Sequence, residues 1–272
     1  MKVVLFCGGE GMRLRGYADD IPKPMVHVGN RPILWHLMKY YAFHGHKDFI
    51  LCLGYKGGAI KDYFLHYDES VSNDFVWSKG GRDIRYSNED IADWTITFVE
   101  TGATANIGER LKAVESYLDG DEMFLANYGD GLSNVPLAEQ MDAFEKSKAI
   151  ASLLLVQPTA SFDLVETSKD GVVKDICPLT RSDIWINGGF FIMKKEIFNY
   201  IQPGEELVRQ PFQRLIQQNA LLAYKYSGFW QCMDTFKDKR CLDELNDRSA
   251  PWKVWSASAE SRNGDPARLT SR

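Results

Sequence analysis

Short apolar runs and longer amphipathic runs alternate along the first 157 residues. The run at residues 3–7 (VVLFC) predicts a buried strand, and residues 33–43 (ILWHLMKYYAF), which follow a proline, predict a helix. The same alternation predicts further strands at 48–53, 95–100, 123–127 and 150–157, and further helices at 59–67, 108–118 and 137–147. Strands separated by helices of this length are typical of βαβ units around a parallel sheet.

The pattern changes after residue 157. Residues 163–174, 185–193 and 222–226 predict strands, and residues 206–218 predict a helix. The polar and aromatic segment 71–93 is long for a plain connection, so we interpret it as an insertion, a lid or an arm. Its Phe75 and Trp77 could serve an interface between copies of the chain. Residues 256–272 contain one large apolar side chain, Leu269, and predict a disordered tail.

Composition and charge limit the class of protein. The chain has 272 residues, of which 44% are hydrophobic and 25% charged, as in a typical soluble globular protein. At about 150 residues per domain, this length allows one or two domains. A net charge of −5 disfavours nucleic acid as a partner. The apolar run at 3–7 is shorter than the roughly 7–15 residues of a signal peptide, and no run approaches the roughly 20 residues that span a bilayer.

The cysteine and histidine content indicates the cellular compartment and bears on metal binding. Five cysteines, an odd number without a CxxC pair, favour a reduced cytoplasmic protein. His44 and His46 are close in sequence, but no further ligand pair lies near them, so we expect no zinc site there.

A glycine-rich segment follows the first predicted strand. Gly8, Gly9 and Gly11 would let the backbone approach a polyphosphate and turn N–H groups towards it. They lie at the strand end where open α/β sheets bind ligands. Arg13 and Arg15 add positive charge that can fork onto phosphate oxygens. We therefore expect a phosphate cradle here.

A lysine between two prolines follows this segment. Pro22 and Pro24 stiffen the backbone around Lys23, which suits a lysine that must sit at one point. Such a lysine beside a phosphate cradle would stabilise charge in phosphoryl or nucleotidyl transfer.

Two other glycine motifs fit less well. The dinucleotide fingerprint G-x-G-x-x-G requires a glycine where this chain has Leu14, which disfavours a nicotinamide-dependent dehydrogenase. The Walker P-loop requires G-x-x-x-x-G-K-[ST]. Gly11 and Gly16 have that spacing, but Tyr17 and Ala18 stand in place of the lysine and the hydroxyl residue.

An aspartate flanked by glycines follows the strand predicted at 123–127. Gly129 and Gly131 leave room beside Asp130 for a metal ion and a phosphate, and Mg²⁺ uses one or two carboxylates together with phosphates and water. The alternative is a turn-capping aspartate, as in many D-G turns. A magnesium site here needs a second carboxylate from another part of the chain.

The segment GGEGMRLR at residues 8–15, with KPM starting at Lys23, resembles the GGxGTRL…KPM signature of sugar-1-phosphate nucleotidylyltransferases. Similarity to the glucose-1-phosphate cytidylyltransferase branch continues in order to residue 255, as at 54–57 (GYKG), 128–131 (YGDG), 187–191 (NGGFF), 228–231 (GFWQ) and 250–255 (APWKVW). The resemblance implies an α/β fold, a Rossmann-like three-layer sandwich with a mixed, mainly parallel central sheet. It implies one domain over 1–255, with 1–157 mainly the nucleotide half and 158–255 mainly the sugar-phosphate half, and it leaves the tail 256–272 outside.

The same resemblance implies a reaction. An oxygen of a sugar 1-phosphate would attack the α-phosphorus of a nucleoside triphosphate, with CTP favoured, and pyrophosphate would leave. Mg²⁺ on Asp130 and Asp234 would bridge the α-phosphate, Arg13 would stabilise the leaving pyrophosphate, and Lys23 would stabilise the α-phosphate. Asp234 could instead be a helix N-terminal residue, with Thr235 as the cap. We expect a homo-oligomeric cytoplasmic enzyme with no membrane or nucleic-acid partner.

The remaining binding residues also come from the resemblance. The nucleotide is expected to contact Gly8, Gly9, Gly11, Met12, Thr101, Gly102, Gly108 and Arg110. The sugar phosphate is expected to contact Tyr128, Gly129, Glu166, Asn187 and Gly188.

The match breaks in the acceptor half. The family's Glu-Lys-Pro motif contacts the sugar and its phosphate, but Ile176 and Cys177 take the Glu and Lys positions here. Losing a charged hydrogen bond to a phosphate costs about 1.5–3 kcal/mol, unless Lys174, Arg181 or another cation replaces it. Two alternatives therefore stay open: the same chemistry with a different nucleotide and a non-glucose sugar phosphate, and a catalytically silent regulatory protein that binds sugar nucleotides.

Overall fold

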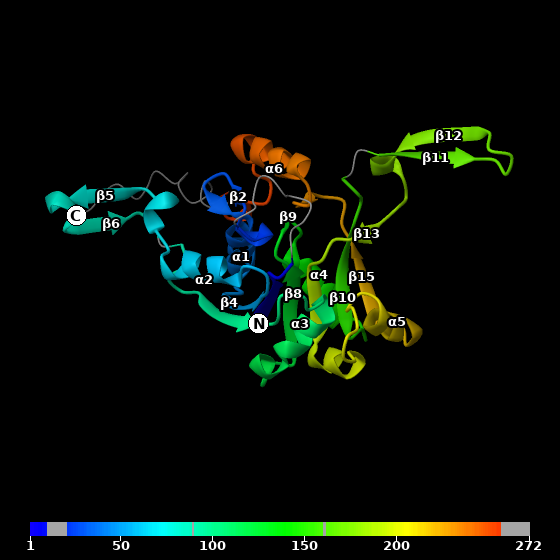
Figure 1. Ribbon diagram of the computed structural model, residues 1–272, viewed down its shortest axis with the longest axis horizontal. Helices are drawn as coiled ribbons and strands as arrows, with labels where there is room; N and C mark the ends of the chain where they lie inside the picture. Colours follow the sequence, from blue (N-terminus) through cyan, green and yellow to red (C-terminus); the bar gives the residue numbers. More distant parts are fainter. Residues whose placement is uncertain (10–20, 89, 160–161, 257–272) are drawn as a thin grey trace.

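The computed structural model describes residues 1–9, 21–88, 90–159 and 162–256, and Figure 1 shows a central sheet with helices on both faces. In this part of the chain the sheet has eight strands, ordered β13-β10-β14-β8-β1-β4-β7, with β15 paired to β10. Six strands run in one direction, while β13 and β14 are antiparallel to their neighbours. The strands are β1 (Lys2–Phe6), β4 (Asp48–Leu53), β7 (Thr95–Glu100), β8 (Met123–Tyr128), β10 (Ala151–Val156), β13 (Ile186–Asn187), β14 (Phe191–Lys194) and β15 (Leu221–Lys225).

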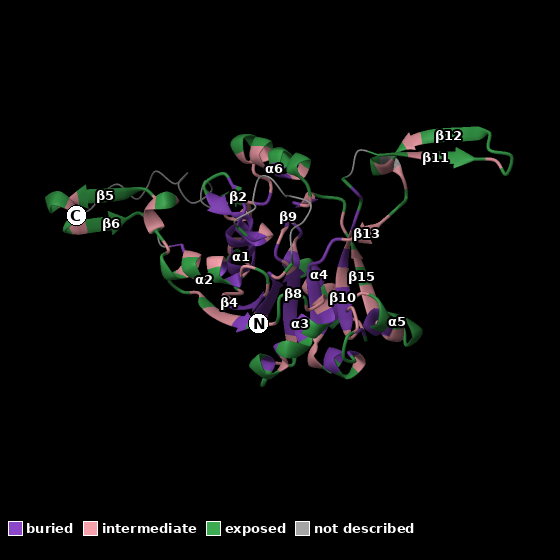
Figure 2. Ribbon diagram, viewed as in Figure 1, coloured by how far each residue is buried: buried purple, intermediate pink, exposed green. Residues whose placement is uncertain are grey.

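Both faces of the sheet are buried under helices, as Figure 2 shows. Val3 and Leu5 of β1 belong to one apolar cluster, and Val4 and Phe6 belong to the other, so the strand is apolar at successive positions. The first cluster takes side chains from α1 (Ile33–Phe43), α2 (Gly57–Leu65), α4 (Leu137–Glu145) and α6 (Phe236–Arg248). The second takes them from α3 (Ile107–Ala113) and α5 (Gln210–Gln217). The expected three-layer sandwich with a mainly parallel sheet is confirmed.

Four two-stranded pairs lie outside the central sheet within the described residues. They are β2 (His27–Val28) with β3 (Arg31–Pro32), β5 (Phe75–Ser78) with β6 (Asp83–Tyr86), β9 (Gly131–Ser133) with β16 (Trp230–Cys232), and β11 (Asp163–Thr167) with β12 (Val173–Pro178). The β5–β6 and β11–β12 hairpins project from opposite ends of the body (Figure 1). Among the described helices, none is both long and apolar enough to cross a membrane.

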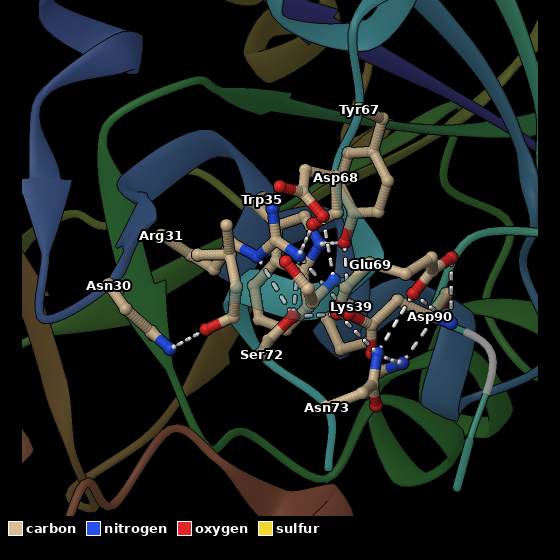
Figure 3. Close-up of polar contacts among 12 residues, drawn as sticks. Asn30, Arg31, Trp35, Lys39, Tyr67, Asp68, Glu69, Ser72, Asn73 and Asp90 are labelled. Carbon is tan, nitrogen blue, oxygen red and sulfur yellow. Dashed lines mark hydrogen bonds and ion pairs between the residues drawn. The ribbon is translucent and has the colours of Figure 1, made fainter. Parts of the chain in front are cut away.

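The segment 71–93 is an arm, and a buried polar cluster holds its root (Figure 3). Arg31, whose side chain is 2% exposed, donates hydrogen bonds to Ser72 Oγ and to the main-chain oxygen of Asp68 at 2.7 Å. Its guanidinium lies 4.3 Å from the centre of the Tyr67 ring. Asp90, on the far side of the hairpin, lies 3.5 Å from the Arg31 guanidinium and accepts a hydrogen bond from the Tyr67 hydroxyl at 3.0 Å. The cluster thus ties both ends of the arm to the body.

Two strand predictions in the second half are wrong. Residues 163–174 do not form one strand, because the chain reverses at Gly171, whose φ is 81°, and returns as β12. Residues 185–193 are divided into β13 and β14 by Gly189 and Phe190, with φ of 77° and 46°. Positive φ is incompatible with a continuous strand.

Several other predictions are confirmed with small shifts. The helix at 33–43 and the strands at 48–53 and 95–100 agree with the structure to the residue. The helix predicted at 206–218 is α5, which begins later and has Pro211 in its first turn, where proline is tolerated. The helix predicted at 108–118 is divided into α3 and a 3-10 turn, Glu115–Leu118.

Candidate functional site

A cavity of about 690 Å³ opens at the carboxyl ends of β1 and β8. This is the edge of the sheet where open α/β folds bind their ligands. Eight of the predicted site residues line it: Gly8, Gly9, Lys23, Tyr128, Gly129, Asp130, Asn187 and Asp234. The cavity therefore brings together residues predicted for the nucleotide, the sugar phosphate and the metal ion.

Two carboxylates converge at the centre of this cavity. Asp130 follows β8, and Asp234 follows β16. The antiparallel pairing of β16 with β9 brings the two segments together, and the Met233 amide donates to the Asp130 carbonyl at 3.0 Å. Asp130 Oδ2 and Asp234 Oδ1 each lie 2.5 Å from Lys23 Nζ. The pair that the resemblance implied is thus joined around one cation.

The start of α6 positions Asp234. Thr235 is the N-cap of α6 and forms a capping box with Asp238. Asp238 Oδ2 also accepts a hydrogen bond from the Asp234 amide at 3.1 Å. Thr235 is therefore the cap of the helix, and Asp234, just before it, directs its carboxylate to Lys23. The role of Asp234 as a metal ligand stays a prediction.

Lys23 begins a short 3-10 helix, Lys23–Met25. The Met25 amide donates to the Pro22 carbonyl at 2.8 Å, and the Val26 amide donates to the Lys23 carbonyl at 3.1 Å. Burial lowers the pKa of Lys23, but the charge of Asp130 and hydrogen bonds to Asp130 and Asp234 outweigh burial and raise this pKa above its ordinary value. The side chain is therefore a positive charge at the centre of the cavity, paired with both carboxylates.

The nucleotide side is organised by a buried arginine, Arg110, which is 1% exposed. Its guanidinium donates to the Leu53 carbonyl at 3.1 Å and to Thr101 Oγ1 at 2.8 Å, which links the ends of β4 and β7. A Cβ atom on Gly8 would lie 2.1 Å from Arg110 Nη1, so only glycine allows this approach after β1. Burial lowers the pKa of Arg110. Arg110 thus links the ends of β4 and β7 and packs against Gly8 after β1.

A second, smaller cavity of about 290 Å³ adjoins the first, because both are lined by Gly8, Gly9 and Ile107. Arg110 lines it, together with residues 103–106 and Glu206. Gly102, with φ of 99°, turns the chain into this wall. The two cavities form one continuous surface for an elongated ligand.

Gly108 does not line either cavity. A Cβ atom there would lie 2.2 Å from the carbonyl oxygen of Glu205, so this glycine allows α3 to pack against the chain before α5. Gly108 therefore has a packing role in this structure, and its predicted contact with the nucleotide stays a prediction.

On the acceptor side, Asn187 and Tyr128 face the cavity together. Asn187 Nδ2 donates to the Tyr128 hydroxyl at 3.2 Å, and Asn187 Oδ1 accepts from the Gly189 amide at 2.9 Å. Burial raises the pKa of Tyr128 to about 12, so the hydroxyl stays neutral. Gly188 lies behind this wall, and its carbonyl accepts a hydrogen bond from Trp230 Nε1 at 2.8 Å.

Glu166 is not brought to the cavity. It lies on β11, paired with Asp175 across the exposed β11–β12 hairpin that projects from the body in Figure 1. Ile176 and Cys177 lie on β12 of the same hairpin, and Ile176 is exposed. The chain reversal at Gly171 carries β11 and β12 outwards together, so the structure does not place Glu166 at the cavity, and its predicted contact with the sugar stays a prediction.

Several predicted residues lie outside the described part of the chain. They are Gly11, Met12 and Arg13, with Arg15 beside them, and all of the tail after residue 256. Their predicted roles stay predictions.

Sequence reasoning missed several walls of the cavity. Cys7, Trp230 and Cys232 line it, with Phe6, Pro24, Ile107 and Ile186. Burial and the charges of Asp234 and Asp130 raise the pKa of Cys232 to about 12, so it is a neutral thiol. Trp230 lies in the segment GFWQ at 228–231, which resembles the family, and this resemblance could have identified it as a site residue.

The chain matches known proteins along most of its length. A model of the nucleotidyl transferase family matches residues 2–235. The glucose-1-phosphate cytidylyltransferases of Salmonella typhimurium and Salmonella typhi are each 38% identical over 258 residues, covering 94% of this chain and 100% of theirs. The crystal structure of a UDP-glucose pyrophosphorylase complexed with UDP-glucose has a TM-score of 0.66 at 16% identity, covering 91% of this chain and 98% of that one, and shares the fold. With the carboxylate pair and the three-layer sandwich in place, these matches show that the chain belongs to the nucleotidyl transferase family, among the sugar-1-phosphate nucleotidylyltransferases.

Proposed function

We propose that this chain joins CTP and glucose 1-phosphate to give CDP-glucose and pyrophosphate. The observation that carries the proposal is the convergence of Asp130, Asp234 and Lys23 in one cavity at the carboxyl end of the sheet. The choice of CTP and glucose 1-phosphate comes from the Salmonella relatives, which this chain matches over their whole length.

The reaction depends on positioning and charge rather than on acid–base chemistry. The attacking oxygen of a sugar 1-phosphate is already an anion, so no general base is needed. The Lys23 ammonium would neutralise charge that develops on the α-phosphate. The backbone after β1, at Gly8 and Gly9, would carry the triphosphate, and the smaller cavity beside Arg110 would receive the nucleoside.

We also propose that Asp130 and Asp234 hold Mg²⁺ when the nucleotide binds. Two carboxylate oxygens around one point suit a hard cation that keeps water and phosphates as its other ligands. When bound, Mg²⁺ would neutralise and orient the α-phosphate. Removing divalent ions with EDTA should abolish pyrophosphate release, and added Mg²⁺ should restore it.

A second candidate function is the same transfer to another sugar 1-phosphate. Among the described residues that line the cavity, Lys23 is the only lysine or arginine. Ile176 and Cys177 stand on the exposed arm where the family has Glu and Lys. The position where the family has its Lys therefore holds Cys177 here, and we propose that this difference alters the choice of sugar unless Lys174, Arg181 or another cation replaces it.

Pyrophosphate release, measured for the common nucleoside triphosphates against a panel of sugar 1-phosphates, separates the candidates. The highest kcat/KM for CTP with glucose 1-phosphate supports the main proposal. A clear preference for another sugar supports the second. No release with any pair, together with intact binding of CDP-glucose, would instead favour the silent regulatory protein.

We further propose that the chain works as a homo-oligomer in the cytoplasm. The β5–β6 arm exposes a row of large apolar side chains, with Trp77 63% exposed beside Phe75, Val76 and Ile84. The cysteines all lie in the described ranges and are free, as expected of a reduced compartment. In analytical ultracentrifugation, a Trp77→Ser variant should form a smaller assembly, with fewer copies of the chain, than the unaltered protein.

A further inference from the structure

Lys23 occupies the point on which both carboxylates converge. Its Nζ lies 2.5 Å from Asp130 Oδ2 and 2.5 Å from Asp234 Oδ1, so a second cation cannot share that position. We propose that Lys23 is the internal counter-ion of this pair, which holds the carboxylates in place in the free protein and leaves them for the substrate phosphates when a divalent cation binds. The inference rests on the proposed function, since it assumes that these carboxylates receive the cation.

The carboxylates are the fixed partners in this exchange. Pairing of β9 with β16 and the hydrogen bond from the Met233 amide to the Asp130 carbonyl hold the two segments together. The Asp238 carboxylate accepts from the amides of Asp234 and Thr235 at 3.1 and 2.8 Å, and it also accepts from Gln231 Nε2 through its other oxygen at 3.2 Å. The two segments that carry the acidic pair are therefore held by contacts that do not depend on Lys23.

Lys23 is the partner that can move. Its backbone is held in the short 3-10 helix between Pro22 and Val26. Its side chain has a flexible four-carbon stem, and it lines the cavity in which the phosphates would lie. Rotations of the side chain alone can carry the ammonium away from the carboxylates without moving the main chain.

The charges of the two carboxylates favour replacement of the Lys23 ammonium by a divalent cation rather than simple loss of the ammonium. Asp130 and Asp234 face each other at short range in a partly buried site, so without a cation between them they would repel each other. The ammonium supplies this cation in the free protein. A divalent cation and the ammonium therefore compete for one place, and binding of either weakens binding of the other by the same factor. Phosphates in the cavity would favour the divalent cation, because they give the displaced ammonium a new partner.

The competition can be measured without turnover, through Mn²⁺ binding to the nucleotide-free protein followed by electron paramagnetic resonance. A Lys23→Met variant should bind Mn²⁺ on the order of tenfold more tightly than the unaltered protein. The matched control is Lys237→Met, which removes the same charge from the exposed first turn of α6, close to Asp234 in sequence. If Lys23→Met binds no more tightly than Lys237→Met, general electrostatics explains the effect and the counter-ion role is refuted.

A second substitution tests whether the increase in Mn²⁺ affinity arises at this carboxylate pair. Adding Asp234→Asn to Lys23→Met should remove the tighter Mn²⁺ binding, and a gain that persists in the double variant would overturn the proposal. Should Lys23→Met fail to fold, nuclear magnetic resonance of the unaltered protein with ¹³C-labelled lysine replaces it. The Lys23 ε-methylene signal, assigned by its loss in Lys23→Arg, should then shift saturably with Mg²⁺, and no shift would refute displacement.

These outcomes are separate from the test of the reaction. If the unaltered protein releases no pyrophosphate from CTP and glucose 1-phosphate, the proposed function fails whatever the Mn²⁺ measurements show. If it does release pyrophosphate but Lys23→Met shows no gain in Mn²⁺ affinity, the function stands and the counter-ion role alone fails.

Discussion

The two sides of the cavity are built from different kinds of structure. The nucleotide side rests on the ends of β1, β4 and β7, which are parallel neighbours in the sheet, and buried Arg110 links the last two. The acceptor side rests on β13, a strand of two residues, and on the turn at Gly189. Its neighbouring β11–β12 arm is exposed along most of its length, as the colours of Figure 2 show.

The two sides therefore differ in how well they tolerate substitution, because one is part of the buried core and the other lies at the surface. A change at the nucleotide side displaces a buried guanidinium or a strand end, so it disturbs the fold as well as the ligand. A change on the β11–β12 arm meets solvent, so it costs the fold little. The departures at Ile176 and Cys177 lie on this arm. We infer that the acceptor side can change its residues, and with them its sugar, while the site of the reaction stays intact.

The largest effect is expected where the two sides meet. Asp130→Asn should lower kcat by a factor of about 100 to 1,000 for every substrate pair, because it removes half of the carboxylate pair. The thermal unfolding midpoint, followed by circular dichroism, should change little. Asp142→Asn is the matched control, since Asp142 is an exposed helical aspartate paired with Lys146. Near-normal turnover by Asp130→Asn would remove Asp130 from the site.

A smaller effect should be confined to the nucleotide side. Gly8→Ala places a Cβ atom 2.1 Å from Arg110 Nη1, so the guanidinium must move, at a cost of about 1–3 kcal/mol. We expect KM for CTP to rise about tenfold, with KM for the sugar phosphate unchanged. Gly9→Ala is a close control, because a Cβ atom there meets no atom of the described residues within 4 Å. Equal effects of the two variants would contradict the organising role of Arg110.

A change on the acceptor side should affect KM for the sugar phosphate and not KM for CTP. Asn187→Ala removes the hydrogen bonds to the Tyr128 hydroxyl and from the Gly189 amide. It should raise KM for the sugar phosphate by about two- to tenfold and leave KM for CTP unchanged. Tyr128→Phe keeps the bond between Asn187 and Gly189, so its effect should be smaller. Steady-state kinetics with one substrate saturating measures both, and a rise in KM for CTP would show that the two sides are not independent.

The sequence predicted the nucleotide side better than the acceptor side for a physical reason. The strand at 48–53 is buried along nearly all of its length, so its apolar run identifies it directly. The strand at 95–100 is only partly buried, with exposed ends, and its β-branched and aromatic residues identify it. The second half contains short strands and chain reversals at positive φ, such as those at Gly171 and Gly189. These reversals end a strand without a visible change in the hydrophobic and polar pattern of the sequence.

The centre of the site was predictable only in part. Asp130 was identified by its flanking glycines at a strand end and Asp234 by resemblance. The β9–β16 pairing that joins them involves strands of three residues, too short for any period to appear. Trp230 and Cys232 were missed because their side chains enter the cavity only through that pairing. The position of Glu166 away from the cavity could not be predicted, because a sequence match does not show the direction in which a hairpin leaves the sheet.

The smallest effect is expected on the arm, and it decides whether the arm takes part in the reaction. Glu166→Gln should change kcat/KM for the sugar phosphate by less than about twofold, because a charge exposed to solvent contributes little. Asp175→Asn, which alters the residue opposite Glu166 on the hairpin, should behave the same way. If Glu166→Gln alone causes a large loss, specific to the sugar phosphate, then the arm must fold over the cavity when substrate binds. The acceptor side would then be completed by movement of the β11–β12 arm, whereas the nucleotide side is already in place in the sheet.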